Sequence, residues 1–199
     1  MLRKLLLPVF ILGLMNATAQ EAAKPTKETP IDYHEPGAPM PRLKLVTLDT
    51  LSKIYEGREL KKINKSNAKK WGYKPATRVV GNDDLDNNGH LFMMMFNPTC
   101  GHCEDETEML KKNIGMFKKS RVVLVANASM KTYLPDFVKN HKTRDFYPQM
   151  TVGLDSSDFI KQIFQYGALP QINVYDRDRK LIRSYNGEVT MDSLQQYID

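Results

Sequence analysis

Two cysteines, Cys100 and Cys103, are the only ones in the 199-residue chain, and Gly101 and His102 separate them. They follow a short apolar run, Leu91 to Phe96, that turn-forming residues end. After Cys103 the acidic residues come first and the lysines last, which is the order that a helix dipole favours. The sequence therefore predicts that both cysteines lie where a buried strand passes into a helix.

This position favours thiol chemistry. A helix N-terminus carries unpaired N–H groups and partial positive charge, which stabilise a thiolate near Cys100. A spacing of three residues places both sulfurs on one helical face, close enough to form a Cys100–Cys103 disulfide. We expect Cys100 to attack a substrate disulfide and Cys103 to resolve the mixed disulfide. His102, when protonated, adds positive charge beside Cys100.

Two other uses of the cysteines are less consistent with the pattern. A structural bridge across two residues would restrict the unfolded chain very little. A zinc site would need Cys100, His102 and Cys103 with a further ligand such as His90, and the adjacent spacing makes a tetrahedron awkward. We therefore expect a redox dithiol, no metal and no cofactor.

A second motif imitates a calcium loop. The segment 84–89 has the oxygen ligands and the glycine of the first half of an EF-hand. The position that should supply a bidentate carboxylate is Met95, which cannot do so. We interpret the segment as a polar turn before the apolar strand.

The segment 96–103 resembles the active-site turn of the thioredoxin superfamily, and its Cys-Gly-His-Cys tetrad is similar to that of the protein disulfide isomerase type. Glu106 is similar to an acidic residue of the extracytoplasmic TlpA-like branch. The resemblance covers residues 90–199 and implies an α/β, thioredoxin-like fold with a mixed central sheet flanked by helices. It also implies that Cys100 and Cys103 are catalytic.

The resemblance has a further implication at Leu169 and Pro170. In this superfamily a cis-proline faces the disulfide, so we expect a cis Leu169–Pro170 bond with the proline ring near Cys100. Proline lacks an N–H, and the bend would present the backbone of Leu169 to an extended substrate.

Three positions depart from the family pattern. Thr99 replaces a tryptophan that is common before the first cysteine, and Glu108 replaces a helix-kinking proline. Met94 stands where thioredoxin itself has a buried acid that helps proton transfer. Glu106 is therefore the candidate for deprotonating Cys103.

The order of elements after the cysteines supports the same fold. Apolar runs and turn formers predict strands and helices in alternation, with a C-terminal hairpin before the last helix. The predicted elements are a strand at 121–127, a helix at 133–142, a strand at 150–154, a helix capped by Ser156 or Ser157 that ends at Gly167, strands at 171–176 and 180–185, and a helix from Thr190 that carries Leu194, Tyr197 and Ile198.

The N-terminal half divides by composition. Residues 1–19 have the positive start, apolar stretch and small-residue cleavage site of a signal peptide, with the mature chain starting at Gln20. Residues 20–41 form a proline-rich spacer. Residues 42–80 form a basic extension with a predicted strand at 42–48, and residues 81–199 form the thioredoxin-like domain.

These features together predict an exported thiol–disulfide oxidoreductase, periplasmic in a Gram-negative source and otherwise secreted. Its partners would be thiols or disulfides of extracytoplasmic proteins, with a membrane redox partner as a further candidate. Nucleic acid is not expected, because an exported chain without an aromatic-basic motif lacks the usual signature. The alternative is a thioredoxin-fold binding module with little redox turnover.

Overall fold

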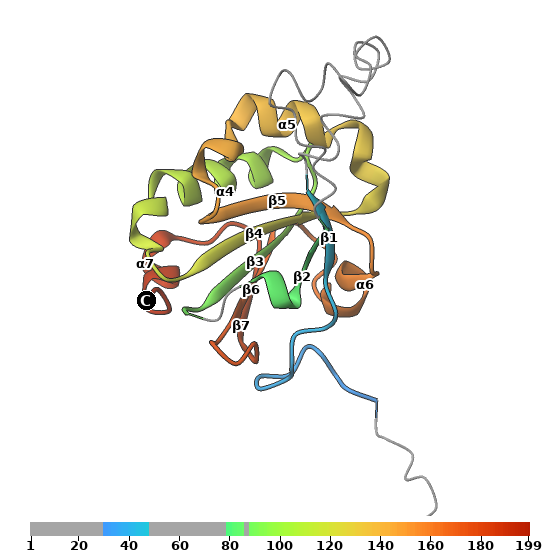
Figure 1. The fold of residues 1–199 in the computed structure, drawn as a ribbon, viewed down its shortest axis with the longest axis vertical. Helices are drawn as coiled ribbons and strands as arrows, with labels where there is room; N and C mark the ends of the chain where they lie inside the picture. Colours follow the sequence, from blue (N-terminus) through green and yellow to red (C-terminus); the bar gives the residue numbers. More distant parts are fainter. Residues whose placement is uncertain (1–29, 48–78, 86–87) are drawn as a thin grey trace, which may run out of the picture. The chain divides into compact units, whose positions relative to one another are not determined.

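The computed structural model describes residues 30–47, 79–85 and 88–199. These residues contain a seven-stranded mixed sheet in the order β2-β1-β5-β4-β3-β6-β7, with helices on both faces (Figure 1). The strands are β1 (Lys44–Thr47), β2 (Val79–Gly81), β3 (Leu91–Phe96), β4 (Arg121–Ala126), β5 (Met150–Asp155), β6 (Gln171–Tyr175) and β7 (Leu181–Asn186). The α-helices are α4 (Gly101–Lys112), α5 (Leu134–His141), α6 (Phe159–Ile163) and α7 (Met191–Gln195). The 3₁₀ helices are η1 (Asn82–Asp84), η2 (Ile114–Met116), η3 (Ala128–Thr132) and η4 (Thr143–Phe146).

Strand β3 lies inside the sheet, between β4 and β6. It runs parallel to β4, with Met94 opposite Leu124, and antiparallel to β6, with Met94 opposite Ile172. All six side chains of β3 are buried. This explains the continuous apolar run, because a strand covered on both faces cannot alternate with polar residues. The predicted mixed sheet flanked by helices is confirmed.

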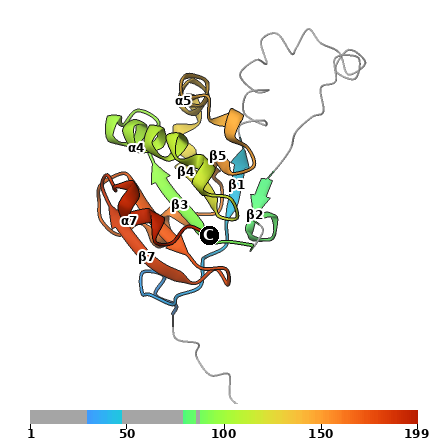
Figure 2. The ribbon, with the colours of Figure 1, turned by 90° about the vertical axis from the view of Figure 1, so that its left-hand side faces the viewer.

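The two faces of β3 supply two separate cores. Its even-numbered residues pack in the core under α4 and α5, which cover the same face of the sheet (Figure 2). Its odd-numbered residues pack on the other face, with Phe159 and Ile163 of α6. Because Cys103 belongs to the first core, the helix that carries it is fixed to the sheet.

Helix α6 differs from its prediction. It begins after Asp158, whose φ of 59° is left-handed, and ends at Ile163 rather than at Gly167. Neither Ser156 nor Ser157 caps it. The carboxylate of Asp155, at the end of β5, accepts the N–H of Ile160 at 2.9 Å. A capping carboxylate from the preceding strand therefore replaces the predicted serine.

The described end of the proline-rich spacer pairs with the domain. Met40 is buried, its N–H donates to the Arg179 carbonyl at 2.7 Å, and the N–H of Gly37 donates to the Leu181 carbonyl at 2.7 Å. Strand β1 of the predicted basic extension lies in the sheet beside β5, and β2 spans the predicted boundary at 81. Strands β1 and β2 therefore belong to the sheet, and residues 37–40 pair with the backbone of residues 179–181 at the start of β7.

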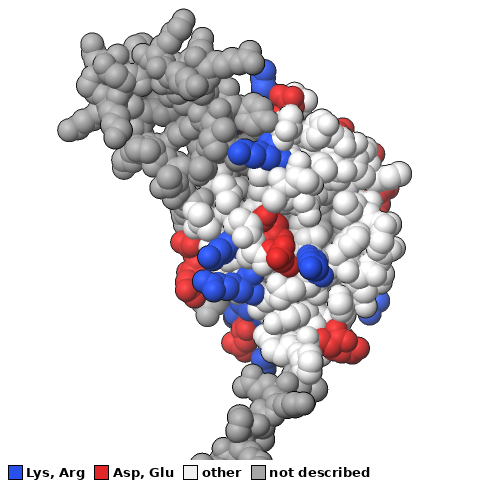
Figure 3. All heavy atoms as spheres, turned by 90° about the vertical axis from the view of Figure 1, so that its right-hand side faces the viewer, with Lys and Arg blue, Asp and Glu red and all other residues white. Residues whose placement is uncertain are grey.

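Most of the basic segment, residues 48–78, lies outside the described residues, as does the predicted signal peptide. On the face shown in Figure 3, the described Lys and Arg side chains lie near Asp and Glu side chains. Within the described ranges, no helix combines the length and the apolar character that a bilayer span requires.

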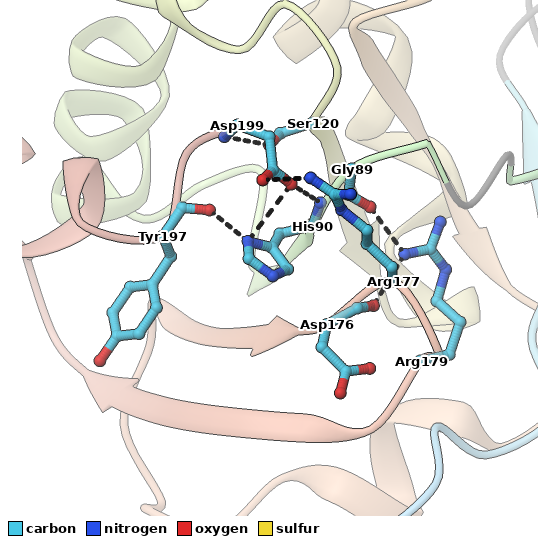
Figure 4. Close-up of polar contacts among 8 residues, drawn as sticks. All are labelled: Gly89, His90, Ser120, Asp176, Arg177, Arg179, Tyr197 and Asp199. Atoms are coloured by element: carbon cyan, nitrogen blue, oxygen red, sulfur yellow. Dashed lines mark hydrogen bonds and ion pairs between the residues drawn. The ribbon is translucent and has the colours of Figure 1, made fainter.

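The last described residues are held against the start of β3 (Figure 4). The carboxylate of Asp199 accepts the guanidinium of Arg177 at 2.8 Å and the N–H of His90 at 3.0 Å. The N–H of Asp199 lies 3.2 Å from the Ser120 hydroxyl, and Nδ1 of His90 lies 2.6 Å from the Tyr197 carbonyl. Tyr197 and Ile198, which were predicted on the final helix, lie beyond its end at Gln195.

Gly89 has a packing reason that the calcium motif does not provide. A Cβ at this position would lie 2.5 Å from the carbonyl carbon of Lys119, so only glycine fits. Its own carbonyl accepts Arg179 at 3.1 Å. Position 95, where the calcium motif needs a carboxylate, is a buried methionine in β3. Gly89 therefore positions the start of β3, whereas residues 86 and 87 of the motif lie outside the described residues.

Candidate active site

A side-chain-stabilised turn carries the chain from β3 into α4. The side-chain oxygen of Asn97 accepts the N–H of Thr99 and its hydroxyl, both at 3.0 Å. The N–H of Cys100 donates to the Asn97 carbonyl at 3.1 Å. Cys100 is the N-cap residue of the twelve-residue helix α4, as the sequence predicted. Its sulfur therefore lies beside the unpaired amides of the helix.

The two cysteines occupy different environments. Cys100 is partly exposed, Cys103 is fully buried, and both are free thiols. Burial, a hydrogen bond with Cys100 and the charges of Cys100 and Glu106 together raise the pKa of Cys103 to about 12, against the lowering effect of the Asn97 backbone. Cys100 is therefore the sulfur that a partner can reach. Cys103 stays a thiol at neutral pH and needs a proton acceptor to react.

Glu106 is placed to be that acceptor. Its side chain is 2% exposed and lies on the same helix as Cys103. One carboxyl oxygen accepts the N–H of Val189 at 3.0 Å, and the other has no partner among the described residues. Burial raises the pKa of Glu106 to about 7, against the opposing effect of the Val189 N–H. A carboxyl with this pKa can both take and return a proton near neutral pH.

The same carboxyl should make stability depend on pH. Because the pKa of Glu106 rises from 4.5 to about 7 on folding, the folded protein holds this proton more tightly than the unfolded chain does. The resulting stabilisation is complete below pH ~4.5 and is lost as pH rises through about 7. The total loss in the free energy of unfolding is about 3 kcal/mol. Urea unfolding from pH 4 to 8 should show this loss in the native protein and not in Glu106→Gln. Parallel curves for the two proteins would contradict it.

His102 is exposed at the start of α4. Its Nδ1 lies 2.5 Å from a carboxylate oxygen of Glu188, and the two side chains are 76% and 51% exposed. His102 therefore lies between the two cysteines along the first turn of α4, and its imidazole has an acidic partner that the sequence did not predict. Gly101 is also exposed, a Cβ there would meet no atom within 4 Å, and nothing in the structure requires glycine at this position.

The loop before β6 completes the site. The predicted cis bond between Leu169 and Pro170 is present. The sulfur of Cys100 lies 4.0 Å from the Leu169 carbonyl oxygen, and the N–H of Gly187 donates to the Pro170 carbonyl at 2.8 Å. The structure therefore brings the Leu169 carbonyl, which precedes the cis bond to Pro170, beside Cys100, although Cys100 and Leu169 are 69 residues apart in sequence. A second cis bond, Tyr147–Pro148, was not predicted.

The departures from the family pattern have local explanations. Met94 is 1% exposed and packs in the core, so no acid stands behind the cysteines at that position. Glu108 is exposed on α4 and accepts Lys111 at 2.7 Å and Nδ1 of His141 at 2.7 Å. Helix α4 is thus linked to α5 through His141.

The segment 187–189, between β7 and α7, was missed as part of the site. Glu188 contacts His102 across 86 residues, and Val189 contacts Glu106 across 83. No local motif marks these positions. Only the register of the sheet, which brings the end of β7 beside the start of β6 and so beside Pro170, could have indicated them.

His90 cannot join the cysteines as the further ligand of the zinc alternative. His90 lies at the start of β3 and bonds to the last described residues, whereas the cysteines follow the end of the strand (Figure 4). Six strand residues separate the two places by roughly 20 Å. Across residues 30–47, 79–85 and 88–199, no three His, Cys, Asp or Glu side chains gather as a metal site would require.

Comparisons with known proteins agree with this architecture. No protein-family model matches the sequence, and no curated protein sequence is similar to it at a significant level. Solved structures are similar to it. The thioredoxin domain of a thiol-disulfide oxidoreductase from Bacteroides vulgatus has a TM-score of 0.56 and 14% identity, covering 83% of this chain and 99% of that chain.

Two further structures give the same result. StoA from Bacillus subtilis has a TM-score of 0.52 and 12% identity over 81% of this chain and 98% of its own. A thiol:disulfide interchange protein from a Bacteroides species has a TM-score of 0.54 and 16% identity over 81% of this chain and 86% of its own. The chain therefore has a thioredoxin-like fold.

Proposed function

We propose that this protein is an exported thiol–disulfide oxidoreductase that exchanges the Cys100/Cys103 pair with cysteines of extracytoplasmic proteins. One observation carries the proposal: the helix N-terminus presents one reachable sulfur, with a buried thiol and a buried carboxyl behind it. A structural bridge would need neither the exposed sulfur nor the carboxyl. The solved structures with the same fold include proteins named as thiol-disulfide oxidoreductases, which supports the same chemistry.

The reaction follows from the difference between the two sulfurs. The Cys100 thiolate attacks one sulfur of a substrate disulfide, and the other substrate sulfur leaves with the electron pair of the broken bond. Glu106 takes the proton of Cys103, whose thiolate then attacks Cys100 in the mixed disulfide. The substrate leaves with two thiols, and the protein leaves with a Cys100–Cys103 disulfide. The protein itself carries the electrons, so no cofactor takes part in these steps.

The Leu169 carbonyl supports a role in substrate binding. It lies beside the Cys100 sulfur at the end of a loop that leads into β6. An extended peptide next to Cys100 could donate a backbone N–H to this carbonyl, as in strand addition to a sheet edge. Such a contact recognises backbone and not side chains, so it suits clients of varied sequence.

A redox titration tests the proposed chemistry. The purified protein should shift between two thiols and none, in one two-electron transition, when equilibrated with mixtures of reduced and oxidised dithiothreitol. Thiol alkylation with mass spectrometry reads the state at each ratio. A protein that binds clients through this surface without exchange, the alternative from the sequence, would keep two alkylatable thiols throughout and refute the proposal.

Export is tested separately. If residues 1–19 are a signal peptide, the mature protein in its native host should begin at Gln20 and be found outside the cytoplasm. N-terminal sequencing of protein from fractionated cells reads this directly. A cytoplasmic protein that begins at Met1 would contradict export and leave the thiol chemistry unaffected.

A further inference from the structure

The segment 187–189 contacts three parts of the site at once. The N–H of Gly187 donates to the Pro170 carbonyl at 2.8 Å, and the N–H of Val189 donates to Glu106 at 3.0 Å. Gly187 has a φ of 75°, a left-handed conformation that glycine adopts without steric cost. Both neighbours of Glu188 are therefore fixed by hydrogen bonds to other parts of the site. Its backbone is fixed beside the start of α4.

The carboxylate of Glu188 contacts His102 at one defined atom. Its Oε1 lies 2.5 Å from Nδ1 of His102. An ionised carboxylate can only accept a hydrogen bond, so Nδ1 must be the donor and carry a proton. The hydrogen bond at one ring nitrogen determines which nitrogen of a neutral imidazole carries the proton. With Nδ1 bound to Glu188, Nε2 is the nitrogen that can exchange a proton with other groups.

The exposure of this pair argues against a structural purpose. With side chains 76% and 51% exposed, the ion pair contributes little to stability. Its charge nevertheless reaches the interior: burial is the main cause of the raised pKa of Glu106, and the charge of Glu188 adds to it. The carboxylate is thus placed to act on the chemistry of the site and not on the fold.

We propose that Glu188 is a positioning residue, which holds His102 with its proton on Nδ1 so that Nε2 exchanges a proton with the sulfur that leaves during disulfide exchange. This inference rests on the proposed function. It assigns to an unpredicted residue the orientation of the imidazole of His102, two residues after Cys100 on the first turn of α4.

The two ring nitrogens of His102 have different roles in the proton transfer. In the imidazolium form of His102 both carry a proton. When the Cys100 thiolate bonds to one substrate sulfur, the other sulfur leaves with the electron pair and takes the proton of Nε2. Cys100 is oxidised, the leaving sulfur is reduced, and neutral His102 keeps its proton on Nδ1, where Glu188 accepts it. The reverse step returns a thiol proton to Nε2.

The test compares Glu188→Ala and Glu188→Gln with the native protein. The first variant removes the acceptor, whereas the amide oxygen of the second can still accept from Nδ1. Nitrogen-15 NMR of the reduced, full-length protein reports which ring nitrogen of His102 carries the proton when the ring is neutral. Rapid-mixing kinetics with oxidised glutathione, whose alkyl thiolate needs a proton on leaving, report the exchange rate.

We expect Glu188→Ala to lose the Nδ1–H form and to slow exchange on the order of tenfold. Glu188→Gln should restore both. Asp136→Ala removes an exposed acidic residue on a different helix, α5, and it should match the native protein in both measurements. In a His102→Ala background, Glu188→Ala should have no further effect on the rate of the first step, the formation of the mixed disulfide on Cys100, in which Glu106 takes no part.

Two results would overturn the inference: an unchanged His102 proton position in Glu188→Ala, or a changed position with an unchanged rate. A further effect of Glu188→Ala on this first step without His102 would also overturn it, because Glu188 would then act on Cys100 by another route. Failure of the proposed function looks different, since the native protein itself would not react with glutathione disulfide.

Discussion

Cys103→Ser is expected to stop exchange at a mixed disulfide on Cys100, whereas Cys100→Ser should fail at the first step. The reason is the difference in exposure and ionisation between the two sulfurs. Cys100 is partly exposed at the N-terminus of α4, while Cys103 is buried and has its pKa raised to about 12. A thiol with that pKa is ionised to only about one part in 10⁵ at pH 7, so it cannot replace Cys100 as the attacking group.

A chromogenic aromatic disulfide, 5,5′-dithiobis(2-nitrobenzoate), separates the two steps. The native protein should release two thionitrobenzoate ions, one when Cys100 attacks and one when Cys103 resolves. Cys103→Ser should release one and retain the other as a stable adduct, and Cys100→Ser should release the first at least 100-fold more slowly. In cells, Cys103→Ser should accumulate disulfide-linked client proteins. Equal adduct formation by the two variants would reverse or abolish the assigned roles.

The strand, the turn and the redox helix were predictable because their signals are contiguous. The apolar run, the Asn97-Pro98 break and the charge order along the helix fall within about twenty residues. The cis bond at Pro170 was predicted by the family resemblance and not by its local sequence. Glu106 was likewise predicted by the family resemblance, and its burial follows from the helical face that it shares with Cys103, three residues earlier.

What was missed depends on long-range pairing. Glu188 lies 86 residues from His102, and nothing near it in sequence differs from an ordinary polar loop. Long-range pairing was also missed at the described end of the spacer. Its prolines indicate an extended chain, but they do not indicate that this chain pairs with the backbone of Arg179 and Leu181. At α6, the composition indicated a cap but not which residue supplies it. The carboxylate of Asp155 reaches that position only because β5 ends there.

Glu106→Gln is expected to slow the attack of Cys103 on the mixed disulfide by about 100-fold at pH 8, with little effect on the attack by Cys100. The variant keeps a side-chain oxygen that can accept the Val189 N–H, so the carboxyl is removed without removing the hydrogen bond. With a pKa of about 7, the native Glu106 carboxyl becomes ionised as pH rises from 6 to 8. The resolving step should therefore accelerate over this range and then level off. The Gln variant should lose that dependence.

The two thionitrobenzoate releases measure this effect without any assumption about the client, because the second release reports Cys103 alone. Asp105→Asn, an equal change at an exposed acid on the same helix, is the matched control and should leave both phases unchanged. If Glu106→Gln slows the first release as much as the second, the carboxyl acts on Cys100 or on the fold of the site. If neither release changes, another group accepts the Cys103 proton, because a thiol with a pKa of about 12 cannot supply the required thiolate unaided near neutral pH.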